Sequence, residues 1–243
     1  MIETCKDDPE GIVAGAHVLD NPIWHSLNGA HQSLALTDGR AARYPADVSP
    51  FMTLPADATG AEWEALGRLA GPDPVLIMDA PDGAPPSWTL VRRVPLYQMV
   101  ADEPALGRRK EEEPAFPIEP LHSADTGAMR ELAAATKPGP FEARTAQLGV
   151  FLGARDGGKL IAMAGERMRP DGWTEISAVC THPDYRGRGL ARALTERMID
   201  GILARGERPF LHVLTANDNA VRLYKAMGFT IRRTAANSLY RPA

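Results

Sequence analysis

The segment HPDYRGRGLARAL, residues 182–194, places basic side chains and glycines directly ahead of a helical pattern. Backbone N–H groups at the start of a helix point outward and carry partial positive charge, which favours a bound anion. Gly187 and Gly189 keep Cβ atoms away from that backbone, and Arg186 and Arg188 add charge at the rim. These residues predict a cradle for a pyrophosphate group.

Other anion-binding loops fit this segment less well. A dinucleotide fingerprint requires GxGxxG, but Arg192 stands where the third glycine belongs. No GxxxxGK followed by Ser or Thr occurs, which excludes a Walker-type loop. A nucleic-acid patch is disfavoured because Glu196 and Asp200 interrupt the arginines and no aromatic residues are interleaved. A merely solvated helix start would not explain the glycines, which weaken helix propensity.

The composition is that of a globular protein with a slight acidic excess. Hydrophobic residues make up 44% of the 243 residues, enough for a sizeable core. The 31 acidic residues outnumber the 27 Lys and Arg residues, giving a formal net charge of -4 and a pI near 5.9. That sign is wrong for a general nucleic-acid binder, so we expect no nucleic-acid partner.

Cysteine usage and hydropathy indicate the compartment. Cys5 and Cys180 are far apart and lack CxxC spacing, so the sequence predicts neither a disulfide framework nor a metal site. The N-terminal residues MIETCKDDPEG are acidic where a signal peptide is basic and then apolar, and no apolar run approaches the ~20 residues that span a bilayer. We expect a cytoplasmic protein that does not enter the membrane.

A charged, proline-studded segment divides the chain. Residues 101–120, ADEPALGRRKEEEPAFPIEP, have the composition of a solvated linker. We expect an N-terminal α/β domain over residues 1–104, a linker over 105–116 and a second domain over 117–243, both near the usual domain size.

The second domain alternates strand and helix patterns. Leu190, Leu194, Met198 and Ile202 recur at helical spacing, whereas Asp156, Gly157 and Gly158 mark a hairpin turn. The predicted elements are a strand over 117–121, a helix from 125 that stops before Pro138, a short helix over 141–148, two hairpin strands within 149–168, a strand over 173–181, a helix from Leu190 to near Gly206, a strand over 210–214, a helix closed by Gly228 and a strand within 229–240. This order predicts a mixed α/β sheet.

The first domain gives weaker patterns. Residues 21–36 and 61–71 favour helices, and residues 74–80 and 90–100 favour strands. No loop in the first domain resembles RGRG. We therefore expect only one anion site, in the second domain.

Two segments together carry a family resemblance: EISAVCTHPDYRGRGLARAL, residues 175–194, and NDNAVRLYKAMGF, residues 217–229. The first resembles the central motif of the GNAT acyl-CoA N-acyltransferases, whose loop pattern (Q/R)xxGx(G/A) is matched by Arg186, Gly189 and Ala191. The second resembles the next GNAT motif, and a helix and a strand of fitting lengths separate the two. The six-residue pattern alone is unspecific, but the ordered pair is specific.

The resemblance covers about residues 117–240, and TKPGPF and GERM are similar to the FR47-like branch of the GNAT superfamily. It implies an α/β (α+β) fold with a mixed, mostly antiparallel sheet flanked by helices. In related proteins the N-terminal half is often a degenerate copy of the same fold, which would apply here by analogy.

The resemblance implies acetyl-CoA as co-substrate and no metal. The pyrophosphate would lie on the amides of residues 186–191, and the pantetheine arm would pair with the backbone of Val179 and Thr181 like an added strand. The backbone N–H of Val179 would face the oxyanion of the intermediate. The cofactor-binding residues expected from the family pattern are Val179, Cys180, Thr181, Arg186, Gly187, Arg188, Gly189, Leu190, Ala191, Asn217, Asn219 and Tyr224.

Two catalytic candidates follow from the resemblance. Tyr224 occupies the family's tyrosine position and, with an ordinary pKa of ~10, could protonate the leaving thiolate; the alternative is packing on an apolar helix face. Glu175 begins the strand before the loop and could act as a base; the alternative is a pairing with an arginine. Glu166 and Glu142 are fallback bases, and a neutral amine would need none. Catalysis by His182 is disfavoured because it belongs to the turn over the phosphates.

The acceptor side would be formed by residues 137–148 and the hairpin, with Phe141 as a wall and Glu142 and Glu166 nearby. The expected acceptor is a primary amine, on a small molecule or a peptide. Acidic side chains at that mouth would favour a cationic amine. The competing hypotheses are a non-catalytic acyl-CoA-binding sensor or scaffold and an acyltransferase that uses another acyl-CoA; the oligomeric state is open, with a homodimer as one alternative.

Overall fold

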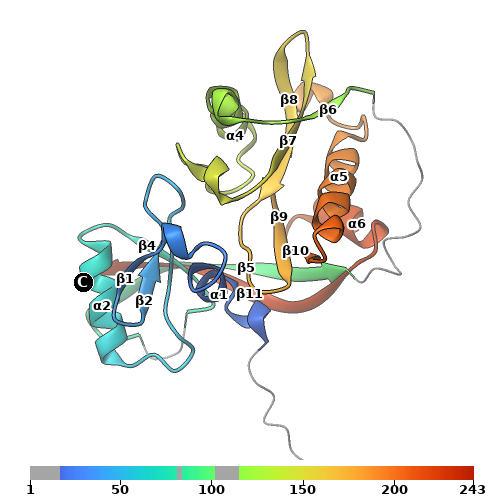
Figure 1. Cartoon of the computed structure of the whole chain (residues 1–243). Helices are drawn as coiled ribbons and strands as arrows, with labels where there is room; N and C mark the ends of the chain where they lie inside the picture. The colour runs from blue at the N-terminus through green and yellow to red at the C-terminus, as the bar shows by residue number, and fades with distance from the viewer. Residues whose placement is uncertain (1–16, 81–83, 102–114) are drawn as a thin grey trace, which may run out of the picture.

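The computed structural model describes residues 17–80, 84–101 and 115–243 (Figure 1). The strands in these ranges are β1 (Leu36–Asp38), β2 (Ala41–Arg43), β3 (Phe51–Thr53), β4 (Val75–Met78), β5 (Trp88–Ala101), β6 (Ile118–Pro120), β7 (Phe151–Asp156), β8 (Lys159–Glu166), β9 (Trp173–Thr181), β10 (Arg208–Leu214) and β11 (Phe229–Pro242). The α-helices are α1 (Pro22–Leu27), α2 (Gly60–Ala70), α4 (Thr126–Thr136), α5 (Leu190–Ala204) and α6 (Asp218–Ala226).

In the described ranges, eleven strands form one sheet in the order β1-β2-β3-β4-β11-β5-β10-β9-β8-β7-β6. The β3–β4 and β9–β10 pairs are parallel, and the other neighbouring pairs are antiparallel. The mixed, mostly antiparallel sheet flanked by helices that the sequence predicts is therefore confirmed. No helix in the described ranges combines the length and the apolar character needed to cross a membrane.

Two long strands connect the halves of the chain. β5 belongs to the first half but lies between β10 and β11, and β11 lies between β5 and β4. Leu96, for example, is opposite Leu214 of β10 on one side and Ala235 of β11 on the other. The predicted linker over 105–116 falls almost entirely outside the described ranges, so the division into domains stays a prediction.

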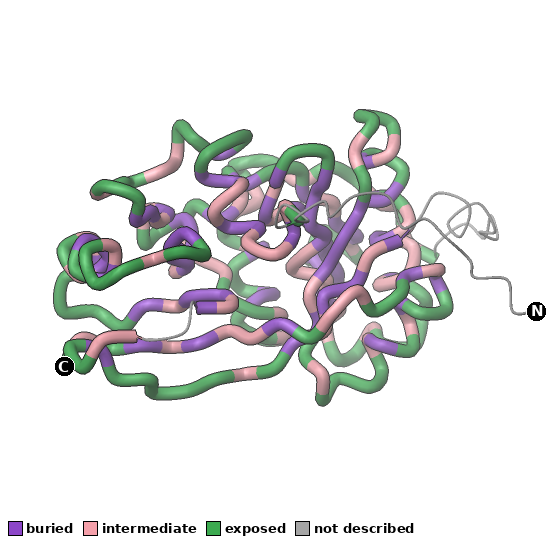
Figure 2. The backbone as a smooth tube through the Cα atoms, turned by 90° about the horizontal axis from the view of Figure 1, so that it is seen from below, coloured by how far each residue is buried: buried purple, intermediate pink, exposed green. Residues whose placement is uncertain are grey.

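Helices cover both faces of the second half of the sheet, with α5 and α6 on one side and α4 on the other (Figure 1). Side chains of a strand alternate between faces. Ala162 and Ala164 of β8 accordingly pack in one cluster with Leu194 of α5, whereas Met163 between them packs with Met129 of α4. Figure 2 shows buried segments concentrated in the interior of the molecule and exposed segments around its outside.

The helix ends follow local chemistry. Thr59 and Glu62 form a reciprocal capping box at the start of α2. α4 ends at Lys137, which has a left-handed φ of 51°, because Pro138 next in the chain disfavours a continued helix. α5 ends before Gly206, as the sequence predicts.

Three sequence predictions differ from the structure. The helix expected over 21–36 is divided into α1 and a 3-10 turn at Gln32–Leu34, because the chain folds back at Gly29, where a Cβ would stand 2.8 Å from the His25 carbonyl oxygen. The short helix over 141–148 is a 3-10 turn, Thr145–Leu148. The three-residue strands β1 to β3 were not predicted, because segments this short show too little alternation.

Gly165 of β8 allows the close packing of the β7–β8 hairpin. A Cβ at this position would stand 2.2 Å from the Cδ1 and Cε1 atoms of Phe151. We expect Gly165→Ala to lower the free energy of unfolding by about 1–3 kcal/mol, measured by urea denaturation, because the ring must shift in a packed core.

Gly127→Ala is the matched control. Gly127 lies in the first turn of α4, and nothing stands within 4 Å of its ideal Cβ position. The substitution should leave stability unchanged or raise it by up to about 1 kcal/mol. Equal stability of the two variants would contradict the packing argument.

Candidate functional site

The parallel strands β9 and β10 separate partway along their length. They pair from Trp173 opposite Arg208 to Ile176 opposite Leu211, and the pairing ends there. β9 continues for several residues alongside β8, whereas β10 continues alongside β5. The two strands therefore diverge within a continuous sheet, and their facing backbone edges are left for another partner.

A β-bulge accompanies this divergence. Between the pairs Met163–Cys180 and Gly165–Ser177, β9 contains one more residue than β8. Ala178 lies in this bulge with a φ of 52°, a left-handed conformation that costs a non-glycine residue about 1–2 kcal/mol. Bulges bend the strand that carries them, and strained backbone of this kind is found mainly at functional sites.

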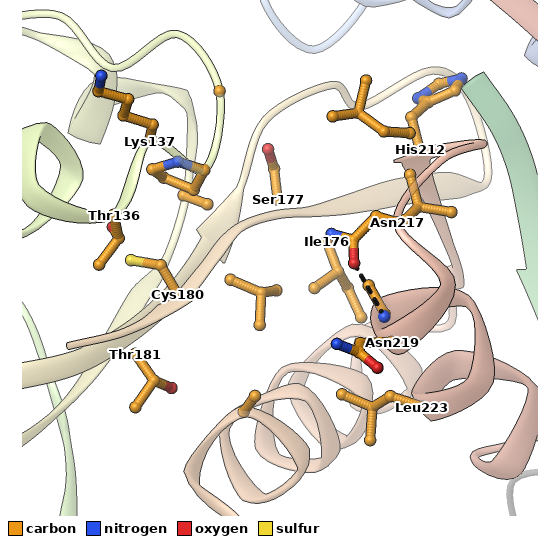
Figure 3. A pocket seen from close by; sticks show the side chains of 18 of the residues that line it. Thr136, Lys137, Ile176, Ser177, Cys180, Thr181, His212, Asn217, Asn219 and Leu223 are labelled. Atoms are coloured by element: carbon orange, nitrogen blue, oxygen red, sulfur yellow. Dashed lines mark hydrogen bonds between the residues drawn. The ribbon is translucent and has the colours of Figure 1, made fainter. Parts of the chain in front are cut away.

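A cleft of about 890 Å³ lies where the strands part. Residues 176–181 of β9 line its centre, and the segment 136–140 lies beside them (Figure 3). The glycine loop and α6 line one end. Leu76 of β4 and alternate residues of β5 and β11 line the other end, so both halves of the chain contribute to the cleft.

The glycine loop has the conformation that its sequence predicts. Gly187 and Gly189 both have φ of 76°, in the left-handed region that favours glycine, and Gly189 is the N-cap of α5. No protein atom lies within 4 Å of either ideal Cβ position, so backbone conformation rather than crowding by the protein requires these glycines. The N–H groups of the first turn of α5 are thereby presented to the cleft.

Most predicted cofactor-binding residues line the cleft. They are Val179, Cys180, Thr181, Arg186, Gly187, Gly189, Leu190, Ala191, Asn217, Asn219 and Tyr224. Arg188 does not: its guanidinium stacks on the Tyr185 ring at 4.9 Å and donates to the Asp184 carbonyl oxygen at 3.3 Å. Arg192, which sequence analysis used only to exclude a dinucleotide loop, does line the cleft.

Residues of β9 and α6 give the cleft some of its polar and ionisable groups. Burial raises the pKa of the Cys180 thiol to about 11, so it stays protonated. Thr181 Oγ1 is buried and has no hydrogen-bond partner in the described part of the chain. Asn217 caps α6 by accepting from the Ala220 N–H at 3.2 Å. The Tyr224 ring packs edge-on against Phe229, and burial raises the pKa of its hydroxyl to about 12.

Glu175 lies behind the cleft rather than on its surface. Its carboxylate accepts from Nε and Nη2 of Arg167 at 2.8 and 2.6 Å, and from Nδ1 of His212 at 2.7 Å. Burial by itself would raise the pKa of Glu175, but the Arg167 charge and hydrogen bonds, together with His212, outweigh it and lower the pKa to about 2. The carboxylate is thus ionised, with Arg167 and His212 between it and the cleft.

His212 lines the cleft from β10, and no role was predicted for it from the sequence. Arg232 donates to the Gln98 Oε1 atom at 2.8 Å, which fixes the orientation of this amide. The Gln98 amide nitrogen therefore donates to the Leu19 carbonyl oxygen and to the His212 Nε2 atom, at 2.7 and 3.1 Å. In this arrangement His212 Nδ1 donates to Glu175 and Nε2 accepts from Gln98. The sequence does contain one indication of this role: His212 is the polar residue in the otherwise apolar segment FLHVL, residues 210–214.

The predicted acceptor-side residues do not line the cleft. Phe141 packs edge-on against Phe151, with 5.8 Å between ring centroids. Glu166 is buried, paired with Arg205 at 2.6 Å and accepting from the Val150 N–H at 3.1 Å. The backbone N–H of Glu142 donates to the Thr145 hydroxyl at 2.7 Å.

Of the segment 137–148 that was expected on the acceptor side, residues 137–140 do line the cleft, together with Thr136. His182, at the turn before the glycine loop, has its Nε2 atom 3.2 Å from the Lys159 ammonium and is not part of the cleft lining. In the described ranges, no group of three or more His, Cys, Asp or Glu side chains is arranged to hold a metal ion.

Known proteins share this fold and these motifs. Residues 151–238 match the model of the family described as FR47-like protein. A crystal structure from Novosphingobium aromaticivorans, described as a GNAT-family acetyltransferase, superposes with a TM-score of 0.83 at 38% sequence identity, covering 93% of this chain and 99% of that one. The chain belongs to the GNAT family. Within the family, the matched model assigns it to the FR47-like branch.

Curated acetyltransferases match part of the chain. N-alpha-acetyltransferase RimI of Mycobacterium tuberculosis is 39% identical over 82 residues, which are 32% of this chain and 51% of that protein. Mycothiol acetyltransferase of Thermomonospora curvata is 37% identical over 93 residues, which are 38% of this chain and 30% of that protein. The chain thus spans about half of the first relative and a smaller share of the second.

Glu175 should govern the acid stability of this GNAT chain. Its pKa is lowered on folding from 4.5 to about 2, so its stabilising contribution is present above about pH 4.5 and is lost as the pH falls towards 2. We expect Glu175→Gln to lower the free energy of unfolding at pH 7 by about 3–5 kcal/mol, because Arg167 is left buried without its counter-charge. Urea denaturation at pH 7, 4 and 3 measures both effects.

Glu119→Gln, on the exposed face of β6, is the control and should match the parent chain at each pH. The difference between the parent chain and Glu175→Gln should shrink as the pH falls. A difference that stays constant from pH 7 to pH 3 would contradict the assignment.

Proposed function

We propose that this protein is an acetyl-CoA-dependent N-acetyltransferase that moves the acetyl group directly to a primary amine in a ternary complex. The observation that carries the proposal is the cleft between β9 and β10, with the glycine loop at one end and Tyr224 in its wall. The relatives support the acetyl group, since their names describe acetyltransferases, but those names differ in acceptor.

Acetyl-CoA fits the cleft by its phosphates and its amides. The pyrophosphate would lie on the N–H groups of residues 186–191, with Arg186 and Arg192 at the rim. The pantetheine arm is an extended chain of amides, and beyond Ile176 the edge of β9 that faces β10 is left without a strand partner. An added-strand pairing with Val179 and Thr181 would satisfy that backbone, and the buried Thr181 hydroxyl lies beside it.

The transfer forms an amide C–N bond and breaks the thioester C–S bond. The amine nitrogen attacks the carbonyl carbon, the negative charge of the intermediate lies on the carbonyl oxygen, and the N–H of Val179 in the bulge is the proposed donor to it. The nitrogen then loses one proton to solvent, the departing thiolate gains one, and the side chain that supplies it is reprotonated from solvent. Tyr224, whose pKa of about 12 keeps it protonated at neutral pH, donates to the sulfur as the C–S bond breaks.

Glu175 is better suited to positioning than to proton abstraction. A carboxylate with a pKa of about 2 is a weak base near neutral pH, and all its contacts to Arg167 and His212 would have to break for it to reach an amine. The His212 Nε2 lone pair is already occupied by Gln98. We therefore propose that the acceptor enters as the free amine and that Arg167, Glu175 and His212 hold the shape of the acceptor end.

Removing the Tyr224 hydroxyl should affect chemistry and spare binding. We expect Tyr224→Phe to lower kcat by about 10²-fold, the low end of general acid contributions, with the Kd for acetyl-CoA unchanged. Thiol release measures kcat, and isothermal titration measures Kd. Tyr240→Phe, in the separate cluster against Trp63, is the control and should keep full activity. An unchanged kcat in Tyr224→Phe would remove this residue as the acid.

The backbone of the glycine loop should determine CoA affinity. Gly189→Val and Gly157→Val introduce the same strain, since both glycines have positive φ and open space around them, but Gly157 lies in the β7–β8 turn away from the cleft. We expect similar losses of stability, about 1–2 kcal/mol each. Titration with acetyl-CoA should show loss of binding for Gly189→Val alone. Equal affinities would disprove the proposed cradle.

A further inference from the structure

The acceptor end of the cleft is formed by one face of the sheet. Strand side chains alternate, so residues two apart along a strand share a face. Arg92, Val94 and Leu96 of β5 meet this condition, as do Asn237 and Leu239 of β11, and all of them line the cleft. Leu239 is directly opposite Arg92, and Asn237 is directly opposite Val94. The wall is therefore apolar with two polar positions, which are diagonal neighbours on adjacent strands.

Each of the two polar positions lacks a protein partner. In the described part of the chain, the Arg92 guanidinium makes no hydrogen bond or ion pair. Asn237 Oδ1 is buried and has no hydrogen-bond partner in the same part of the chain. A buried acceptor is normally satisfied, so this oxygen indicates a ligand that brings an N–H donor.

The charged side chains that line the cleft in the described ranges are all basic. No Asp or Glu side chain of the described ranges lines it, whereas Arg92, Lys137, Arg186 and Arg192 do. Arg167 also lines it, but its charge is matched by Glu175 behind. Arg186 and Arg192 lie at the phosphate end, which leaves Arg92 and Lys137 without a counter-charge at the acceptor end. A polycationic acceptor would meet no anion here, contrary to the expectation that acidic side chains favour a cationic amine.

We propose, on the basis of the proposed acetyltransferase function, that the acceptor is a free amino acid with an apolar side chain. Its carboxylate binds the Arg92 guanidinium, its amino group donates to Asn237 Oδ1, and its side chain packs on the wall formed by Leu76, Val94, Leu96 and Leu239. Arginine suits a carboxylate because its planar fork donates two parallel hydrogen bonds. A peptide N-terminus offers the amine without the neighbouring carboxylate and is the competing acceptor.

Matched acceptors test the carboxylate. Leucine, leucinamide, 3-methylbutylamine and the dipeptide Leu-Gly share one side chain but differ in the group next to the amine, and analogous sets exist for methionine and phenylalanine. With saturating acetyl-CoA, thiol release and mass spectrometry of the product measure kcat/KM. We expect the free acid of at least one set to exceed its amide, its amine and its dipeptide by about 10- to 100-fold, the effect of a charge-assisted hydrogen bond.

Two arginine variants test the residue. Arg92→Gln should raise KM for the free acid by the same factor and leave kcat/KM for the matching amine unchanged. Arg93→Gln is the control, because the neighbouring Arg93 donates to the Ser238 hydroxyl and does not line the cleft. It should keep the preference for the acid. Unfolding curves of both variants verify that the fold is retained.

The outcomes separate this inference from the proposed function. Equal or better turnover of the amine, the amide or the dipeptide, or a preference for the acid that survives Arg92→Gln, overturns the carboxylate site while the acetyltransferase remains. Turnover of none of the acceptors also overturns the amino-acid proposal. If acetyl-CoA additionally fails to bind in isothermal titration, the proposed function is lost as well.

Discussion

The site depends on the end of β9–β10 pairing at Ile176 and Leu211. Parallel strands in a continuous sheet normally keep their hydrogen bonds, and leaving the backbone groups unpaired in a buried position is unfavourable. Here the bulge at Ala178 bends β9, and the left-handed backbone of this alanine is maintained by the strands around it. The cost of the opening is offset elsewhere, in the long β5–β11 and β7–β8 pairings that hold both sides of the cleft.

The long strands explain how a motif in one half of the chain acquires a binding wall from the other. β10 ends at Leu214, which is opposite Leu96 of β5. β5 extends past this point, because its residues from Trp88 up to the one before Leu96 have no partner in β10. The part of β5 that extends past the end of β10 therefore pairs with β11 alone. One face of this part of β5 is left to line the cleft. The second half supplies the loop and Tyr224, while Arg92 and Val94 come from the first half. An isolated second half would have the phosphate cradle but only part of the acceptor wall.

The sequence predicted the motif half well because its signals are local. Strand 173–181 agrees with β9 at both ends, and helix 190 to near Gly206 agrees with α5, since hydrophobic spacing, glycine and proline act within a few residues. The acceptor side was not predictable in this way. Phe141, Glu142 and Glu166 are adjacent to the cleft in sequence, but their contacts to Phe151, Thr145 and Arg205 hold them away from it. His212 and Asn237 required the register of distant strands, which no local pattern contains.

The charge of the cleft depends on ion pairs that cannot be read from the amino-acid composition. The chain has a net charge of -4, yet three carboxylates of its second half are paired with arginines: Glu175 with Arg167, Glu166 with Arg205 and Glu207 with Arg169. A buried carboxylate is tolerated only when it is paired and hydrogen-bonded, so these arginines also keep the carboxylates away from the cleft surface. Of the arginines that line the cleft, Arg167 is paired with Glu175 and Arg192 lies 3.4 Å from Glu196, whereas Arg92 and Arg186 have no carboxylate partner in the described ranges. The proposed preference of the cleft for anionic groups therefore rests on the basic residues of its lining, from which Asp and Glu are absent in the described ranges, and the overall charge of the protein has little influence on it.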